Sequence, residues 1–188
     1  YRNTISSRTI GILINGSGGP QSYASFNTFT NDTIVPCTTG CASNYNDIVL
    51  TANATDITFT NVSFNKSRIL IDDLSADINN LTVKWFLSVN VTNATNNNPI
   101  ANAQVVINDS FATNIFTGNT DATGGIATLE VTEFTMNGSV PFTASTDTCT
   151  DVRSNINITC FTPYNITVNT SDVRNFTSID VNRSKFVN

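Results

Sequence analysis

The stretch from Leu81 to Val91 constrains the fold of this chain more than any other. Apolar residues occupy every second position, namely Leu81, Val83, Trp85, Leu87, Val89 and Val91. The positions between them are mostly polar. A period of two sustained over this length predicts a β-strand with one face in a core. Trp85, the only tryptophan, is therefore expected to be a core residue.

Most of the remaining sequence consists of short alternating segments that are separated by Asn, Gly, Asp and Ser. We expect strands at Ala24–Thr30, Asp47–Ala52, Asp56–Phe64, Ile69–Ile71, Ala101–Asn108, Thr113–Gly118, Ile126–Phe134, Val140–Ser145, Asn155–Phe161, Tyr164–Val168 and Phe176–Val181. Together with Leu81–Val91 these predict an all-β fold, an Ig-like or pilin-like sandwich of roughly ten short strands. The alternation changes phase after Phe59, which predicts a bulge or bend there. We find no second domain boundary and no repeat of solenoid length.

The N-terminal residues differ from the other predicted strands. Thr9–Ile14 is the most apolar short run in the chain, and the Gly-rich linker Asn15–Pro20 follows it directly. Gly/Ser-rich segments behave as flexible coil. We therefore divide the chain into a tail (1–14), a linker (15–20) and a head domain (21–188).

Two arrangements of the tail are open. It can be a donor strand that inserts into a neighbouring subunit, with Ile5, Ile10, Ile12, Leu13 and Ile14 making the contact. It can also be an ordinary first strand of its own sandwich. The linker is longer than a tight hairpin needs, which favours the donor strand. Leu81–Val91 and Phe176–Val181 are the candidate neighbours of the inserted strand.

The sequence predicts an exported protein that does not bind nucleic acid. Charged residues form only 12% of the chain and the formal net charge is −5, while Asn and Thr number 28 and 30. Nine scattered Lys and Arg residues form no basic patch for nucleic acid. The chain begins at Tyr1 and has a single methionine, Met136, so we expect that a signal peptide has been removed and that the protein is extracellular or on the cell surface. No apolar run approaches the roughly 20 residues of a membrane helix.

The sequence holds fifteen Asn-x-Ser/Thr sequons. They lie at Asn15, Asn31, Asn53, Asn61, Asn65, Asn80, Asn90, Asn93, Asn108, Asn137, Asn157, Asn165, Asn169, Asn175 and Asn182. In eight of them the middle residue is apolar: Ala54, Val62, Leu81, Val91, Ala94, Ile158, Ile166 and Phe176. On a strand this pattern turns the asparagine outward and the middle residue inward. We therefore expect covalent N-glycans at many of these sites, and no other cofactor.

Four cysteines form two local pairs, Cys37/Cys41 and Cys149/Cys160. Four thiols allow three pairings, and the sequence alone does not choose between them. In an exported chain two short-range disulfides are the default expectation. A zinc site is disfavoured because the pairs lie far apart and the chain has no histidine.

We expect no catalytic residues. Without histidine there is no Ser-His-Asp or Cys-His pair. The only glutamates, Glu130 and Glu133, are expected on opposite faces of one strand. Asp72, Asp73 and Asp77 could bind Ca²⁺ or act as glycosidase carboxylates, but a solvated loop is the simpler interpretation.

An internal isopeptide bond is a further possibility for a sandwich of this kind. It needs a buried lysine beside an acid, with Lys66, Lys84 and Lys185 as the candidates. Lys84 is expected on the outward face of its strand, which disfavours it.

The run from Val83 to Phe134 resembles the carboxypeptidase-regulatory-like sandwich modules of surface proteins. The resemblance rests on the strand with Trp85, on Pro99-Ile100-x-x-Ala103-x-Val105-x-Ile107, and on Thr120-Asp121-x-x-Gly124 before a closing strand. It implies a fold and an extracellular setting, with the Thr-Asp-x-x-Gly element as a hairpin turn.

In size, export, all-β character and sequon density, the chain also resembles the archaeal donor-strand filament subunits, the thread and bundling-pilus classes. This resemblance implies a structural subunit of a glycosylated filament that polymerises head-to-tail with identical subunits, for adhesion to other filaments or cell surfaces, or for biofilm. The alternative is a non-polymerising S-layer or carbohydrate-binding surface module.

Overall fold

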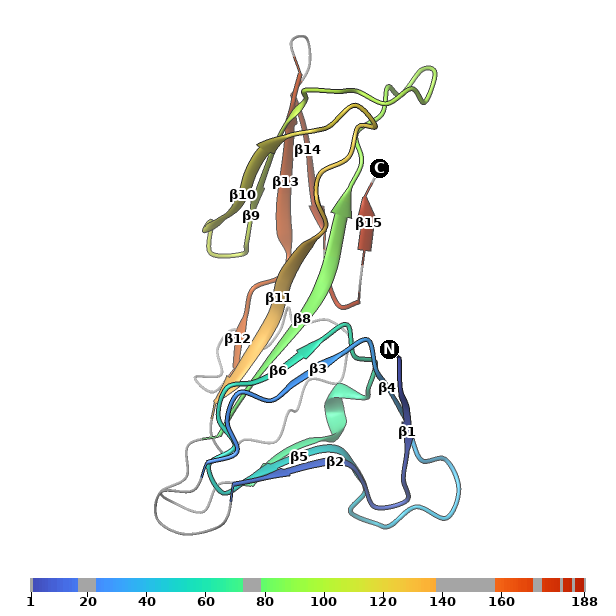
Figure 1. Ribbon diagram of the computed structural model, residues 1–188, viewed down its shortest axis with the longest axis vertical. Helices are drawn as coiled ribbons and strands as arrows, with labels where there is room; N and C mark the ends of the chain where they lie inside the picture. Colours follow the sequence, from blue (N-terminus) through green and yellow to red (C-terminus); the bar gives the residue numbers. More distant parts are fainter. Residues whose placement is uncertain are drawn as a thin grey trace. The chain divides into compact units, whose positions relative to one another are not determined.

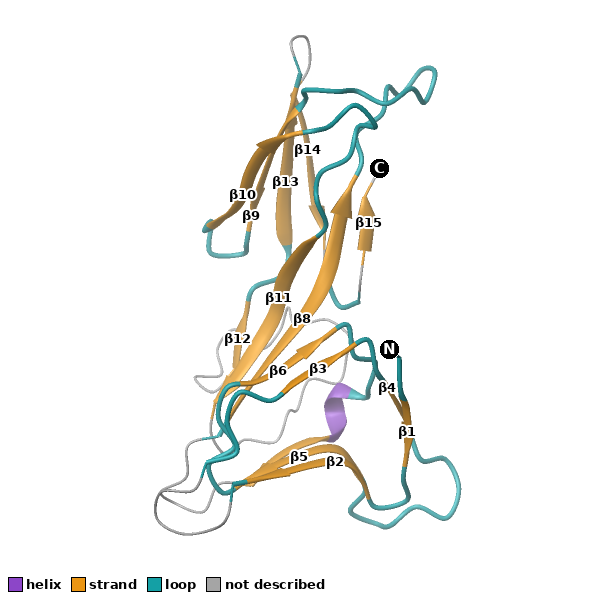
Figure 2. Cartoon of the chain, viewed as in Figure 1, coloured by secondary structure: helices purple, strands orange, loops and turns teal. Residues whose placement is uncertain are grey.

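The chain is all-β, as the sequence predicts. The computed structural model describes residues 2–16, 23–72, 79–137, 158–170, 174–179, 181–183 and 185–187. Within them the only helix is the short 3₁₀ segment η1 (Lys66–Arg68) (Figure 2). The strands are β1 (Thr4–Ser6), β2 (Ile10–Asn15), β3 (Thr28–Thr30), β4 (Thr33–Val35), β5 (Asn46–Thr51), β6 (Ile57–Thr60), β7 (Ile69–Asp72), β8 (Asn80–Val89), β9 (Gln104–Asn108), β10 (Asn114–Asn119), β11 (Leu129–Asn137), β12 (Ile158–Cys160), β13 (Tyr164–Asn169), β14 (Arg174–Ile179) and β15 (Lys185–Val187).

Two compact units divide the chain, where the sequence predicted one head domain. Unit 1 comprises Tyr1–Lys84 and Phe134–Thr159, and unit 2 comprises Trp85–Glu133 and Cys160–Asn188. The predicted tail and linker fall within unit 1.

Unit 1 is built from stacked parallel strands (Figure 1). β1 pairs with β4, and Thr33 of β4 forms a parallel bridge to Ser63. The other two stacks are β2-β5-β7 and β3-β6-β8, and all their ladders are parallel. The chain therefore visits the same three stacks in the same order three times, as in a three-sided β-solenoid. We call the first passage, β1 to β3, the N-terminal coil.

This stacking corrects the sequence analysis, which found no solenoid repeat. Thr28-Phe29-Thr30-Asn31 recurs as Thr58-Phe59-Thr60-Asn61, and the three strand residues of each copy are Cα partners between β3 and β6. Phe29 and Phe59 stack edge-to-face, with ring centroids 4.8 Å apart. In stacked coils, identical residues often lie directly above one another. The two matching tetrapeptides are therefore the sequence feature from which the repeat could have been predicted.

The predicted bend after Phe59 is also present. Asn61, directly after β6, has a left-handed backbone with φ 54°. Its counterpart Asn31, directly after β3, has φ 60°. Asparagine tolerates this conformation better than other residues with a Cβ atom, so the same turn residue ends both strands.

Unit 2 contains the antiparallel sheet β10-β9-β13-β14. Val105 and Ile107 of β9 and Ile166 of β13 are buried on one face of that sheet. The Tyr164 hydroxyl donates a hydrogen bond to the Thr132 carbonyl of β11, 2.7 Å away, and so joins this sheet to β11. The buried face of this sheet and its bond to β11 are consistent with a sandwich-type all-β fold.

β8 and β11 contribute residues to both units. The alternation predicted for Leu81–Val91 is confirmed, since its apolar side chains are all buried and the intervening ones are half-buried. In unit 2, Trp85 donates a 2.7 Å hydrogen bond from Nε1 to Oε2 of Glu133, which is itself fully buried. Glu130 is exposed, so the two glutamates lie on opposite faces of β11 as expected.

Candidate functional site

The apolar strand of the predicted tail is β2, and it pairs with β5 of the same chain. Ile12, Leu13 and Ile14 lie beside Ile48, Val49 and Leu50. The ordinary first strand, one of the two arrangements that the sequence leaves open, is therefore the one found in the single chain. Insertion into a neighbouring subunit stays a prediction. Within the single chain the partner of β2 is β5. Leu81–Val91 and Phe176–Val181 stay the predicted neighbours of a strand inserted from another subunit.

The two faces of β2 are separated as the alternation predicts. Ile12 and Ile14 are buried, Ile10 is half-buried, and Leu13 on the opposite face is 54% exposed. Ile5 of β1 is half-buried and lies beside Ile34 of β4. The strongest apolar contacts of the tail are therefore those of two isoleucines.

Gly11 permits a close approach of β2 to its neighbours. A Cβ atom at this position would lie 2.5 Å from the Asp47 carbonyl oxygen and 2.7 Å from Cγ2 of Ile34. Both distances are shorter than real side chains allow, so only glycine fits without movement of the backbone. The contact surface of β2 is thus specific in shape as well as apolar.

Each strand of the N-terminal coil, β1, β2 and β3, is an edge strand of its sheet. In the described part of the chain each has one hydrogen-bonded neighbouring strand: β4 for β1, β5 for β2 and β6 for β3. The N-terminal coil therefore forms one end of the stack in unit 1. Edge strands of this kind are where β-sheets pair with further chains or exchange strands between subunits.

An asparagine pair stabilises the stack at its corner, and the sequence analysis missed it. Nδ2 of Asn61 donates a 2.7 Å hydrogen bond to Oδ1 of Asn31. The main chain follows the same order, since Asn31 N donates to Thr60 O and Asn61 N donates to Lys84 O. Asn31 and Asn61, both predicted glycan acceptors, thus also make a structural contact.

The sequon geometry agrees with the outward orientation expected of it. Every sequon asparagine except Asn157, which lies outside the described residues, has a half-buried or exposed side chain. Six apolar middle residues are buried, namely Ala54, Val62, Leu81, Val91, Ile158 and Ile166. Ala94 is exposed, which contradicts the prediction for that sequon, because it lies in a loop instead of a strand. The Phe176 side chain is outside the described part.

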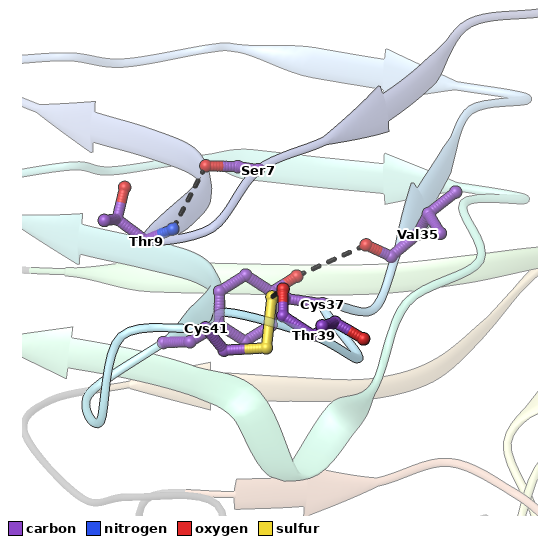
Figure 3. Close-up of a disulfide and its surroundings, with 7 residues drawn as sticks. Ser7, Thr9, Val35, Cys37, Thr39 and Cys41 are labelled. Atoms are coloured by element: carbon purple, nitrogen blue, oxygen red, sulfur yellow. Dashed lines mark hydrogen bonds between the residues drawn. A yellow bond between two sulfur atoms is a disulfide. The ribbon is translucent and has the colours of Figure 1, made fainter.

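The predicted Cys37–Cys41 disulfide is present, with a Cα separation of 5.8 Å (Figure 3). It closes the loop after β4, and Ala42 N, directly after that loop, donates a hydrogen bond to Arg8 O between β1 and β2. The Tyr45 hydroxyl donates to Val35 O at 3.4 Å. The disulfide therefore braces a segment that holds the N-terminal coil. Cys160 is buried and disulfide-bonded, whereas Cys149 lies outside the described residues.

The candidate carboxylates form no site in the described part of the chain. Asp73 and Asp77 lie outside it, as does the side chain of Asp72. Among the described residues no group of three or more His, Cys, Asp or Glu side chains could hold a metal ion. Of the isopeptide candidates Lys66 is buried, and Lys84 and Lys185 are half-buried.

The predicted turn after Thr120 is confirmed. Oδ1 of Asp121 accepts hydrogen bonds from the hydroxyl and the N–H of Thr123 and from Gly125 N. These bonds, the hydroxyl of Thr123 first, lower the pKa of Asp121 from its ordinary value of 3.8. In the same unit burial raises the pKa of the Tyr164 hydroxyl, with a further contribution from the charge of Asp109.

The described residues include no helix long and apolar enough to cross a membrane. Comparison of the chain with protein-family models, with curated proteins and with solved structures finds no match.

Proposed function

We propose that this chain is a structural subunit of an extracellular, glycosylated filament, and that subunits join head-to-tail by exchanging their N-terminal strands. The observation that supports this most directly is the position of β2. It stands at the edge of its sheet, it pairs with β5 alone among the described strands, and a Gly-rich linker follows it.

Exchange requires no new surface. If β2 leaves β5 of its own subunit, it can pair with β5 of the next one in the same register, with Ile12 beside Ile48 and Ile14 beside Leu50. Domain swapping re-forms between chains the contacts that a single chain makes internally. Because the donated strand and the acceptor strand differ, each subunit gives one and takes one, and the contact propagates into a filament.

The burial and hydrogen-bond energies of β2 are sufficient for a stable contact between subunits. Ile12 and Ile14 contribute about 2 kcal/mol each when buried, and each main-chain hydrogen bond adds about 1 kcal/mol net. The same contacts stabilise the closed monomer. The balance between the monomer and the exchanged form therefore depends on the subunit concentration relative to the effective concentration of the strand within its own chain. A short flexible linker gives an internal strand an effective concentration in the millimolar range. Exchange is therefore expected where subunits are concentrated, as at a cell surface during export.

A second candidate is a non-polymerising S-layer or carbohydrate-binding surface module. The observation that favours it is that β1, β2 and β3 all pair within their own chain. A whole coil, and not only one strand, would then be a permanent part of unit 1.

Truncation separates the two candidates. Full-length protein and a variant without residues 1–14 are refolded at high concentration, then examined by negative-stain microscopy and light scattering. The filament proposal expects filaments from the full-length chain, discrete particles from the truncated one, and capping of the full-length chain by an added peptide of residues 1–14. Discrete particles from both proteins, or filaments from both, would contradict it.

A deletion of residues 17–19 provides a matched control that keeps every described strand. A shorter linker hinders the return of β2 to its own β5, so this variant is expected to polymerise more readily than the full-length chain. A decrease in polymerisation would argue against exchange.

A further inference from the structure

The described sequon asparagines differ in what their amide groups contact. Asn61 donates from Nδ2 to Asn31 Oδ1 at 2.7 Å, and Asn169 donates from Nδ2 to Gln104 Oε1 at 3.1 Å. In these two residues the nitrogen to which a glycan would be attached already donates a hydrogen bond to another side chain.

Asn93 has the opposite arrangement. Its Oδ1 accepts a 2.8 Å hydrogen bond from the N–H of Thr95, the hydroxyl residue of its own sequon. The two atoms at the ends of an amide point in different directions, so this bond fixes the oxygen and turns Nδ2 away from the main chain. Within the described residues no hydrogen bond from Nδ2 of Asn93 is found.

The surroundings of Asn93 are open and ordered. Residues 93 to 99 are all exposed. The loop is closed by two 2.8 Å main-chain hydrogen bonds, from Asn93 N to Asn98 O and from Asn97 N to Asn93 O. The acceptor nitrogen is therefore presented on a loop of fixed shape that a large enzyme can approach.

We propose that Asn93 is a glycan acceptor in the folded protein, and that the Asn61 sequon is a structural element that the folded protein does not offer for modification. This inference rests on the glycoprotein part of the proposed function and is independent of strand exchange. The sugar donor is a lipid phosphate-linked oligosaccharide. A bond forms between Nδ2 and the anomeric carbon, the bond from that carbon to the phosphate oxygen breaks, the phosphate leaves with the electron pair, and the amide loses one proton to a base.

The expected preference for Asn93 over Asn61 follows from the hydrogen bond that Asn61 would lose on glycosylation. Modification of Asn61 requires release of its part-buried hydrogen bond to Asn31, at a cost of about 1 kcal/mol or somewhat more. A cost of about 1 kcal/mol corresponds to roughly fivefold lower occupancy. Asn93 needs no such rearrangement.

The test compares folded with denatured protein in vitro. The unglycosylated full-length chain is incubated with an oligosaccharyltransferase and a lipid pyrophosphate-linked oligosaccharide, and glycopeptides are quantified by mass spectrometry. Asn93 should be modified in both states, whereas Asn61 should be modified in the denatured chain and about fivefold less in the folded one. Equal occupancy of Asn61 and Asn93 in the folded chain would overturn the inference, as would an Asn93 that is unmodified when folded.

The same loop offers a matched control. Oδ1 of Asn96 accepts a 3.0 Å hydrogen bond from Asn98 N, which is the geometry of Asn93, but Asn96 lies in no sequon. Asn98→Thr is expected to add a second glycan to this loop in the folded state, and Thr95→Ala to remove the first, with Thr95→Ser retaining it. Gain of no glycan from Asn98→Thr would show that this amide geometry does not select the acceptor.

None of these results depends on filament formation. If filaments form but the folded chain shows no preference for glycosylation of Asn93 over Asn61, only the glycosylation inference is refuted. Normal glycosylation of a chain that never polymerises would sink only the strand-exchange proposal.

Discussion

The contact between Asn61 and Asn31 gives the sharpest test of the stacked fold of unit 1. Asn61 combines a left-handed backbone, with φ 54°, and a 2.7 Å hydrogen bond to Asn31. Asn61→Ala removes the amide and leaves alanine, which tolerates this backbone less well. The protein is made in a host without N-glycosylation, so that loss of a sugar does not contribute.

The expected loss for Asn61→Ala is about 2 kcal/mol of unfolding free energy. About 1 kcal/mol comes from the left-handed backbone, and about 1 kcal/mol comes from the hydrogen bond. Asn61→Gly loses the same bond but avoids the backbone cost of alanine, so it should lose only about 1 kcal/mol. The difference between the two variants separates the two contributions.

Urea denaturation of five proteins measures both quantities: the unsubstituted chain, Asn61→Ala, Asn61→Gly, Asn31→Ala and the Asn31→Ala/Asn61→Ala double variant. The double-mutant cycle should give a coupling of about 1 kcal/mol, because the two side chains share one bond. Additive effects within about 0.3 kcal/mol, or an Asn61→Gly variant no more stable than Asn61→Ala, would refute the reasoning.

Three further predictions concern packing, the disulfide and acid stability. Phe59→Ala should cost about 3–5 kcal/mol in a urea titration, because the ring is fully buried and stacks on Phe29; a loss below about 1 kcal/mol would contradict this packing. Replacing Cys37 and Cys41 with serine should cost about 2 kcal/mol, since the closed loop is short; an unchanged thermal midpoint would count against the brace. The lowered pKa of Asp121 means that its contribution to stability is complete above its unfolded value of 3.8 and is lost as pH falls through the lower folded value. NMR titration should place its midpoint below that of a Thr123→Ala variant, and equal midpoints would disprove the assigned cause.

The sequence predicted the strands better than their partners. Leu81–Val91 was identified, with its buried face, because a period of two depends only on which side chains meet the core. The turn at Asp121 was identified because Asp and Gly have specific local roles there. In both cases the signal lies within a few residues of the structure that it determines.

The parallel pairing of unit 1 was not predicted, because alternation is the same whether the neighbouring strand is parallel or antiparallel. The information lay in the recurrence of Thr-Phe-Thr-Asn at Thr28 and Thr58, which a search for a constant repeat overlooks when the loops differ in length. Short strands such as Thr4–Ser6 and Thr33–Val35 were also missed, since three residues carry too little periodicity.

For the candidate site, the sequence predicted which side chains of β2 are apolar, but it could not choose their partner. Ile48 and Leu50 of β5 became the partners only through the register of the fold. The hydrogen bonds that distinguish Asn61 from Asn93 were equally beyond the sequence, because both belong to the same three-residue motif. Tertiary contacts, and not local pattern, decide what each amide does.

Strand exchange is tested most directly by a disulfide across β2 and β5. Leu13 and Val49 are Cα partners in this ladder, a placement that a disulfide can span, and Leu13 is exposed to oxidant. In a Leu13→Cys/Val49→Cys variant, pairing within one chain gives a cross-linked monomer, whereas pairing between chains gives a covalent series of oligomers. The Leu13→Cys single variant, which cannot extend beyond a dimer, is the control. After refolding near millimolar concentration and oxidation, strand exchange should give an oligomer series on a non-reducing gel; a monomer band alone, at every concentration, would contradict strand exchange.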